Sequence, residues 1–462
     1  MNSEIGSTLG VATDHIHPTP EEREECEICK VKIPFKLPKE IVDAAINRKL
    51  VIFAGAGVST ESRDAFSTTL YADISGELNV GGKKRISFSD LMSLYCKRKS
   101  RRMLLQRIKK RFDYMKLFPE IYRDASRFHS ELSTIHYIEE IITTNWDDHF
   151  ERECDATPIV TPDDFAVFSD ILGRRVIKLH GSVSNYGSIV ATEEDYQACY
   201  RRLRSGVIGS VLRVLLASKV VVFVGYSFGD EDFRRIYRLL SREVKQLLPR
   251  AYLITLDKDA QKTVNTMKMN VIPIVTDATY FLAVLKEELV GQKLMLPDVM
   301  FDGLQTVYYR VSKAQDKIYG IDLRVHPENF YSLVYQDGMM HGLEDVMGSR
   351  KSGRFSHPHT IFHLMKSYEF RRTMYSAKHN YKEVAYIDGF LAGLMCLISS
   401  DEQRARVPLF YLFGCGDITS LEDYTRLAKG SHSLHKSAYS YAEKMAKYVP
   451  SGNVSFHHKP FL

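Results

Sequence analysis

The amino-acid sequence predicts an α/β fold built on a doubly wound parallel sheet, with a helical insertion and a mixed, helix-rich C-terminal domain. Short apolar runs rich in β-branched residues recur along the first 275 residues, separated by segments long enough to form helices. This alternation favours parallel strands joined by helical crossovers. Two of the runs, 50–53 and 220–224, lead straight into glycine-rich turns. That arrangement is typical of a parallel sheet whose carboxyl edge faces a nucleotide.

The composition is that of an ordinary globular protein. Hydrophobic residues make up 44% of the 462 residues and charged residues 26%, which predicts a soluble chain of two or three domains. The net charge of +6 is too small an excess to indicate nucleic-acid binding by itself. No apolar run reaches the roughly 18–20 residues of a membrane span, and no basic-then-apolar signal segment opens the chain. We therefore expect a cytoplasmic protein without membrane contact.

The seven cysteines are scattered, apart from the pair Cys26 and Cys29. This usage favours reduced thiols over disulfides. With His15 and His17 upstream, the pair supplies four candidate zinc ligands, but their spacing matches no established zinc motif. Zinc at Cys26 and Cys29 is therefore an alternative to free thiols, and free thiols are what we expect.

Changes in composition divide the chain into three regions. Residues 1–36 form an extension that is rich in Gly, Ser, Thr and Pro and then acidic, with little to bury. Residues 37–290 carry the predicted sheet, and residues 296–462 form a separate domain with frequent Tyr and His. Helical periodicity over 87–123, with lysines and arginines on its other face, predicts the insertion. The expected strands are 50–53, 138–143, 175–179, 219–224 and 251–256, with 271–275 as an edge strand.

The C-terminal domain shows no further strand-then-glycine signature. Apolar spacing predicts helices over 361–375 and 382–399 and a strand over 407–413 that ends at Gly414. No glutamate stands where a zinc protease needs one between histidines, so we expect surface or packing roles for His357, His359, His363, His457 and His458. A solvated face, rather than a nucleic-acid or partner surface, is the better interpretation of the basic residues Arg350, Lys351, Arg354, Arg371 and Arg372.

The first glycine turn is Gly55-Ala56-Gly57, followed by Ser59. Glycines there let the backbone approach a diphosphate closely, with free N–H groups pointing at it. A simple strand-to-helix turn is the alternative. Thr60 stands where a dehydrogenase fingerprint has its third glycine, and no Gly-Lys-Ser/Thr loop is present. The turn therefore indicates a nucleotide site that differs from those of dehydrogenases and P-loop ATPases.

Polar side chains follow the next two predicted strands. Thr144, Asn145 and Asp147 come at the end of the second strand, and His180 follows the third. Because parallel strands end at one carboxyl edge, we expect these side chains on the nucleotide side. Asn145 can donate and accept, so it can hold a ribose hydroxyl or a water, and an imidazole suits a base at neutral pH. A side-chain-to-backbone turn and a structural histidine are the alternatives.

The second glycine turn reads Gly225-Tyr226-Ser227-Phe228-Gly229. Ser227 lies within this turn, and Asp257, after the fifth strand, is positioned to meet the adenosine side of a nucleotide. The same turn fits the Gly-x-Ser-x-Gly spacing of a serine-hydrolase nucleophile, but no convincing Asp and His partners follow in the order that fold uses. We therefore expect nucleotide binding rather than serine hydrolysis.

Four segments, 53–59, 143–147, 178–181 and 223–230, together resemble the sirtuin catalytic domain in order and spacing. They are more similar to the sirtuin-like NAD hydrolases of prokaryotic anti-phage defence systems than to the protein deacylases. The resemblance implies a Rossmann-like domain that cleaves NAD to nicotinamide and ADP-ribose. It implies that Asn145 positions water or ribose and that His180 is the general base, working through the ribose 3′-hydroxyl. The binding residues it implies are Gly55, Ala56, Gly57, Ser59, Thr144, Asp147, Gly225, Ser227 and Asp257.

The sequence departs from the deacylases at two places. Residues 87–200 hold no Cys-x-x-Cys pair, so the zinc ribbon of those enzymes is missing. The segment after Ser59 reads Thr60-Glu61-Ser62-Arg63-Asp64-Ala65-Phe66 instead of their Gly-Ile-x-Asp-Phe-Arg. A protein deacylase is therefore the lesser alternative, and a non-enzymatic sensor or scaffold that binds NAD or ADP-ribose is another.

The resemblance covers about residues 45–285 and also implies a biological setting. It implies an abortive-infection effector that stays inactive until it is triggered, and we expect a homo-oligomer. The segment Gly57-Val58-Ser59-Thr60-Glu61-Ser62 resembles that of the sirtuin-like hydrolases that pair with a hexameric HerA-type ATPase. Such an ATPase is therefore a candidate partner.

Overall fold

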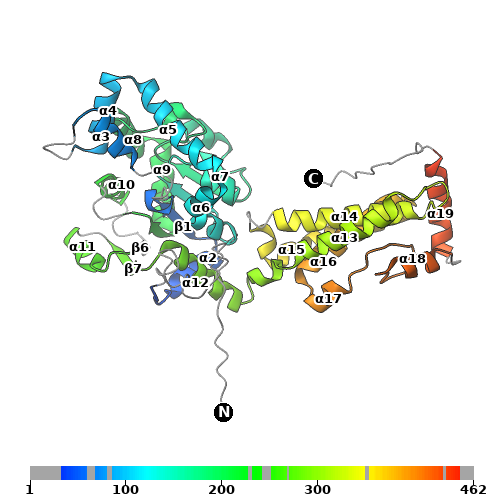
Figure 1. Cartoon of the computed structure of the whole chain (residues 1–462). Coiled ribbons are helices and arrows are strands. Elements are labelled where there is room, and N and C mark those ends of the chain that lie inside the picture. The colour runs from blue at the N-terminus through cyan, green and yellow to red at the C-terminus, as the bar shows by residue number, and fades with distance from the viewer. Residues whose placement is uncertain are drawn as a thin grey trace, which may run out of the picture. The chain divides into compact units, whose positions relative to one another are not determined.

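The structure is a computed structural model that describes residues 33–59, 68–80, 86–226, 231–241, 251–267, 270–348, 353–429 and 433–447. The described residues form two compact units with the main boundary after Gly291, which we call the sheet unit and the helical unit (Figure 1). In the described part of the chain, no helix is long and apolar enough to cross a membrane. The residues with predicted roles that lie outside the described ranges are His15, His17, Cys26, Cys29, residues 60–62, Ser227, Arg350, Lys351, His457 and His458.

The sheet unit is built on seven parallel strands in the order β3-β4-β2-β1-β5-β6-β7. Phe53 at the centre of the sheet pairs with Ile142 on one side and Phe223 on the other. The doubly wound parallel sheet predicted from the sequence is confirmed. The strands are β1 (Leu50–Ala54), β2 (Glu140–Thr143), β3 (Thr157–Ile159), β4 (Arg175–Lys178), β5 (Val220–Val224), β6 (Ala251–Thr255) and β7 (Val271–Val275).

Each predicted strand of this unit is present, with ends that differ by no more than two residues, and β7 is an edge strand as predicted. β1 and β5 are buried at every position, as expected of central strands covered on both faces. The sequence did not predict β3, the opposite edge strand. It has only three residues and contains Pro158, which cannot donate to a β-ladder and is tolerated at an edge.

The chain winds outward from β1 to β2, β4 and β3 and then returns to place β5 on the other side of β1. Open α/β sheets bind ligands where the strand order reverses in this way, outside the carboxyl ends of the strands. Helices cover both faces of the sheet (Figure 1). One face packs on α8 (Glu193–Ser205), α9 (Val207–Ser218), α10 (Glu231–Ser241) and α11 (Ala260–Met267). The other is covered by α2 (Lys39–Ile46), α6 (Pro119–Ser133), α7 (His149–Cys154) and α12 (Ala278–Gly291).

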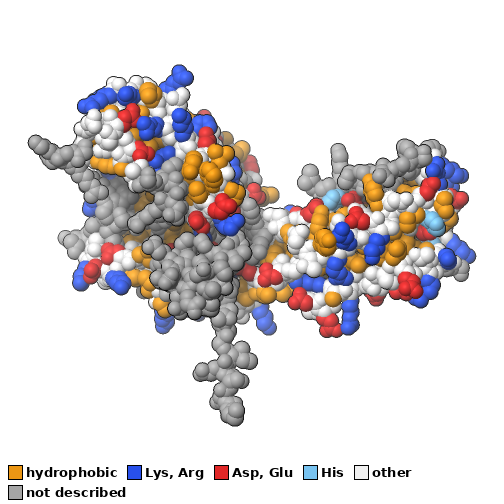
Figure 2. All heavy atoms as spheres, in the orientation of Figure 1, with side chains coloured by type: hydrophobic (Ala, Val, Ile, Leu, Met, Phe, Trp, Pro, Cys, Tyr) orange, Lys and Arg blue, Asp and Glu red, His pale blue; other side chains and the backbone are white. Residues whose placement is uncertain are grey.

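The helical insertion predicted between the first two strands is present. Its helices are α3 (Leu70–Glu77), α4 (Phe88–Arg98) and α5 (Arg101–Leu117). The hydroxyls of Thr69, Ser87 and Ser100 accept hydrogen bonds from backbone N–H groups at the three helix starts, which are favourable N-caps. The helices share a small core with Ile189 and Ala191 from the segment after β4. Lysine and arginine side chains lie on the outer surface of the insertion (Figure 2).

The helical unit contains, in its described part, helices, loops and an isolated bridge between Leu412 and Cys415. The helices predicted over 361–375 and 382–399 are confirmed as α15 and α16. A Cβ on Gly389 would lie 1.9 Å from the carbonyl oxygen of Tyr335, so α14 and α16 pack backbone to backbone. The helices are α13 (Leu304–Tyr319), α14 (Asn329–Gly348), α15 (Pro358–Ala377), α16 (Tyr381–Ile398), α17 (Asp401–Ala405), α18 (Leu421–Ala428) and α19 (Ser433–Ala446).

The prediction of a strand over 407–413 is wrong. The backbone of this segment forms hydrogen bonds with side chains of α14. Gln336 Nε2 donates to the carbonyl oxygen of Leu409 (2.8 Å). Ser332 Oγ donates to the carbonyl oxygen of Tyr411 (3.0 Å) and accepts from its N–H (2.9 Å). Leu409 N and Phe410 N donate to the carbonyl oxygen of Ile418 (2.9 and 3.1 Å), so side chains of α14 and one backbone carbonyl hold the segment in place of a strand ladder. The described C-terminal region is helix-rich, as predicted.

Candidate active site

The glycine turns that follow β1 and β5 pack against each other. Gly55 N donates to Val224 O (2.9 Å), and Gly57 N donates to Gly225 O (2.9 Å). Gly225 has a φ of +69°, and a Cβ on it would lie 2.7 Å from Val58 N. Only glycine adopts this conformation and this close approach without strain. The two turns, with the short helix η1 (Ala56–Val58), therefore form one backbone surface where the strand order reverses.

Asn145 is buried beside this surface, two residues beyond β2, with 7% of its surface exposed. Its backbone N–H donates to Thr143 Oγ1 (3.0 Å). Its side-chain Nδ2 donates to Gly55 O (3.0 Å) and to Ser59 Oγ (2.9 Å). Both amide protons are thus engaged by the first glycine turn, which fixes the plane of the amide. The oxygen Oδ1 is left as the acceptor that can hold a hydroxyl or a water.

Thr144 and Tyr226 join the ends of β2 and β5 across β1. Thr144 Oγ1 lies 3.1 Å from the hydroxyl of Tyr226, which donates to Ala54 O (3.0 Å). A Cβ on Gly55 would lie 2.6 Å from the Tyr226 ring. The ring therefore covers the first glycine turn, and sequence reasoning did not assign it a role. Its place between Gly225 and the next predicted binding residue was the available signal.

His180 stands at the end of the neighbouring strand. Leu179 N donates to Thr143 O (2.9 Å), which continues the pairing of β2 and β4 one residue beyond the end of β4. Adjacent strands lie about 5 Å apart, so His180 and Asn145 occupy neighbouring positions at the carboxyl edge. His180 is buried, and its ring contacts Tyr196 of α8 edge to face, with centroids 5.2 Å apart. The following turn places a left-handed glycine, Gly181, against Ser188.

The helical insertion reaches the same edge. Trp146, the single tryptophan of the chain, directly follows Asn145. Its ring packs against Phe88 at the start of α4, with centroids 6.1 Å apart. The insertion therefore contacts the loop that carries Asn145, through the residue next to it.

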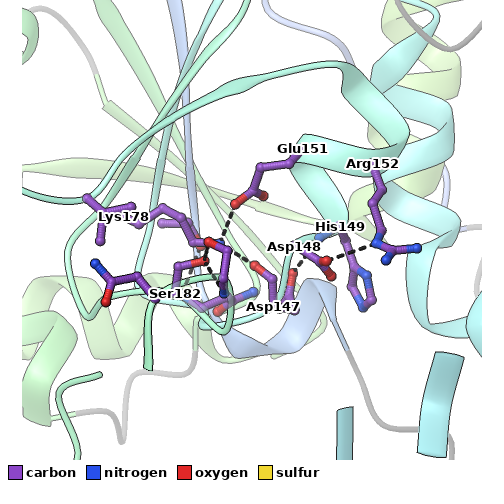
Figure 3. A network of polar contacts seen from close by, with 12 residues as sticks. Asp147, Asp148, His149, Glu151, Arg152, Lys178 and Ser182 are labelled. Atoms are coloured by element: carbon purple, nitrogen blue, oxygen red, sulfur yellow. Dashed lines mark hydrogen bonds and ion pairs between the residues drawn. The ribbon is translucent and has the colours of Figure 1, made fainter. Parts of the chain in front are cut away.

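Asp147 lies in a buried cluster beneath this loop (Figure 3). Its carboxylate accepts from His149 N (3.2 Å). Lys178 Nζ, fully buried, donates to Asp147 O and pairs with Glu151 (2.8 Å). Burial alone would raise the pKa of Asp147, but His149, His129 and Lys178 more than offset this and lower the pKa to about 2. The structure therefore gives this predicted binding residue partners in the protein interior.

Asp257 follows β6, two strands away from β1, and is exposed. Its carboxylate accepts from Asp259 N (2.9 Å), and its own N–H donates to Thr255 Oγ1 (3.2 Å). It makes no described hydrogen bond to the residues around Asn145. Within the described ranges, no three Cys, His, Asp or Glu side chains gather into a group that could hold a metal ion.

His129 is a further residue at the site that sequence reasoning missed. It lies on α6, is fully buried, and its Nε2 is 3.4 Å from Ser59 Oγ. Burial lowers its pKa to about 3, and His149 and Lys178 add to the effect. The imidazole is therefore neutral at physiological pH. No local pattern marked it, because the two residues are 70 positions apart in the chain.

Comparisons with known proteins agree with this geometry. Residues 139–274, which include β2 to β6, match the family described as SIR2-like domain. The chain is 26% identical over 205 residues to NAD(+) hydrolase ThsA of Cytobacillus dafuensis, covering 43% of this chain and 40% of that protein. It is 28% identical over 207 residues to NAD(+) hydrolase ThsA of Enterococcus faecium, covering 43% and 41%. It is 24% identical over 229 residues to Defense-associated sirtuin 2 of Bacillus subtilis, covering 47% and 22%. The chain thus spans less than half the length of each relative.

Proposed function

We propose that this chain hydrolyses NAD⁺ to nicotinamide and ADP-ribose at the carboxyl edge of its sheet. One observation carries the proposal. The first glycine turn binds both amide protons of Asn145 and leaves its amide oxygen as an acceptor, and His180 follows β4, the strand beside β2. A pure binding site needs backbone donors but no base. The similarity to proteins named NAD(+) hydrolase gives the nucleotide its identity in this proposal.

In the proposed complex the paired glycine turns at Gly55, Ala56, Gly57 and Gly225 approach the diphosphate, which glycine permits. Ser59 and Thr144 line the nicotinamide-ribose side. Asp147 acts from beneath by fixing the loop that carries Asn145. Ser227 and Asp257 are proposed for the phosphate and adenosine side.

The proposed reaction starts with cleavage of the bond between the ribose C1′ and the nicotinamide nitrogen, and the electron pair leaves with nicotinamide. A water then forms the new bond to C1′. Asn145 Oδ1 accepts a hydrogen bond from this water and orients its lone pair toward C1′. His180 assists as general base, taking a proton that finally passes to solvent. General-base assistance of this kind contributes about 10²–10⁴-fold to rate.

We further propose that the enzyme serves anti-phage defence as an abortive-infection effector that is inactive until it is triggered. The name Defense-associated sirtuin 2 of one relative supports the defence setting. The segment from Gly57 to Ser62 supports a HerA-type ATPase as partner and, with it, a homo-oligomeric state. The proposed trigger would act on the assembled complex.

The test is NAD consumption by the purified protein, alone and mixed with a purified HerA-type ATPase. Wild type is compared with Asn145→Ala and His180→Ala. Asn47→Ala is the matched control, because Asn47 is an exposed asparagine near the opposite end of β1. We expect both site variants to lose at least about 100-fold in rate and the control to keep the wild-type rate. If NAD binds but stays intact in every mixture, the proposal fails and a sensor takes its place.

A further inference from the structure

A row of three side chains in hydrogen-bond contact leads from the candidate site into the protein interior. Asn145 Nδ2 donates to Ser59 Oγ (2.9 Å), and Ser59 Oγ lies 3.4 Å from His129 Nε2. Asn145 lies in the loop after β2, Ser59 directly follows η1, and His129 belongs to α6. They meet only because α6 packs beneath the first glycine turn.

The direction of the hydrogen bonds follows from the chemistry of the groups. An amide NH₂ group only donates, so Ser59 Oγ must accept from Asn145. The hydroxyl proton of Ser59 can then be donated to His129 Nε2, 3.4 Å away, in the tautomer of the neutral imidazole that carries its proton on Nδ1. We assign this tautomer to His129 as part of the proposal. Burial of His129 keeps the ring neutral at physiological pH, because it lowers the pKa.

We propose that His129 is a positioning residue for the hydrolysis: by accepting the Ser59 proton, it holds Ser59 as an acceptor for Asn145 and so keeps the Asn145 oxygen turned toward the attacking water. This inference rests on the proposed function. His129 touches neither substrate nor the reacting atoms. Without it, the Ser59 hydroxyl can rotate and the amide of Asn145 loses one of the two bonds that fix its plane.

The surroundings of His129 allow a clean test. Its ring packs against Phe150, with centroids 4.4 Å apart, and against His149, with centroids 5.2 Å apart. A phenylalanine suits this aromatic site and removes only the acceptor. His129→Gln restores an acceptor at about the position of Nε2. His149→Phe is the matched control, because His149 is equally buried in the same cluster but makes no described bond to Ser59 or Asn145.

The first measurement is steady-state kinetics of NAD cleavage. We expect His129→Phe to lower kcat about 10-fold with KM unchanged within about twofold, as the loss of one positioning hydrogen bond implies. We expect His129→Gln to recover most of the rate and His149→Phe to keep it. Ser59→Ala should cost as much as His129→Phe, and the double variant no more than either, because both break the same row of contacts. Losses that multiply, or a glutamine variant as slow as the phenylalanine variant, would overturn the proposal.

The second measurement does not depend on catalysis. Selective ¹⁵N-asparagine labelling, with the Asn145 resonance assigned from Asn145→Asp, reports exchange of its side-chain amide protons with water. We expect slow exchange in wild type, His129→Gln and His149→Phe, and at least 10-fold faster exchange in His129→Phe and Ser59→Ala. Equal exchange in all five proteins would overturn the positioning role. Absence of NAD cleavage by wild type with this exchange pattern intact would instead refute the proposed function alone.

Discussion

Replacing Gly225 by alanine tests whether the close approach of the two glycine turns holds the site together. The residue has a φ of +69°, and an added Cβ would lie 2.7 Å from Val58 N and 2.9 Å from Gly55 O. The left-handed backbone costs a residue with a Cβ about 1–2 kcal/mol. Overpacking against backbone adds about 1–3 kcal/mol. We therefore expect Gly225→Ala to lower the free energy of unfolding by about 2–5 kcal/mol.

Gly173→Ala separates the two contributions. Gly173 also has a left-handed φ, +93°, but an added Cβ would meet nothing within 4 Å. This variant should lose only the backbone part, about 1–2 kcal/mol. Urea unfolding followed by the fluorescence of Trp146, the single tryptophan, measures both variants in the sheet unit. Equal losses of unfolding free energy for the two variants would show that contact between the glycine turns contributes nothing to stability.

Two other predictions concern packing and pH. Gly389→Ala should destabilise the helical unit by about 1–3 kcal/mol or more, because its Cβ would lie 1.9 Å from a backbone oxygen. Circular dichroism during urea unfolding measures this loss. The control is Gly348→Ala on α14, which should leave the stability unchanged because its Cβ would meet nothing within 4 Å. The pKa of His129 falls to about 3 in the folded protein, whereas an unfolded histidine binds a proton below about 6.5. The contribution of neutral His129 to the free energy of unfolding is therefore complete above pH 6.5. Between pH 6.5 and about 3 it is lost as the pH falls, at about 1.4 kcal/mol per pH unit. Urea midpoints between pH 6 and 4.5 should fall less steeply for His129→Phe than for wild type, and identical slopes would contradict this assignment.

Local sequence patterns were sufficient to predict the sheet. Each central strand is an apolar run whose end is marked by glycine or a polar residue, so the placement of Asn145 and His180 at the carboxyl edge could be predicted. The strand order that makes β2 and β4 neighbours comes from the structure. The exception within the sheet is β3, which is too short to form a recognisable run.

Contacts between distant segments could not be predicted. Tyr226 meets Thr144 across 82 positions, and His129 meets Ser59 across 70. The orientation of the loop around Asp147 depends on Lys178, which contacts it from another strand. The segment 407–413 has the apolar pattern of a strand, but side chains of α14 and the carbonyl oxygen of Ile418 bind its backbone. In each case a partner far along the chain decides the local structure.

In the proposed hydrolysis, water takes the ribose from nicotinamide in place of an acyl group or the nucleotide itself. This is measured by the yield of nicotinamide, ADP-ribose and cyclic ADP-ribose from one reaction of the purified protein with NAD, run with and without an acetyl-lysine peptide. We expect equal amounts of nicotinamide and ADP-ribose, no cyclic product, no effect of the peptide, and no products from Asn145→Ala. Nicotinamide release that requires the peptide, or a cyclic main product, would contradict it.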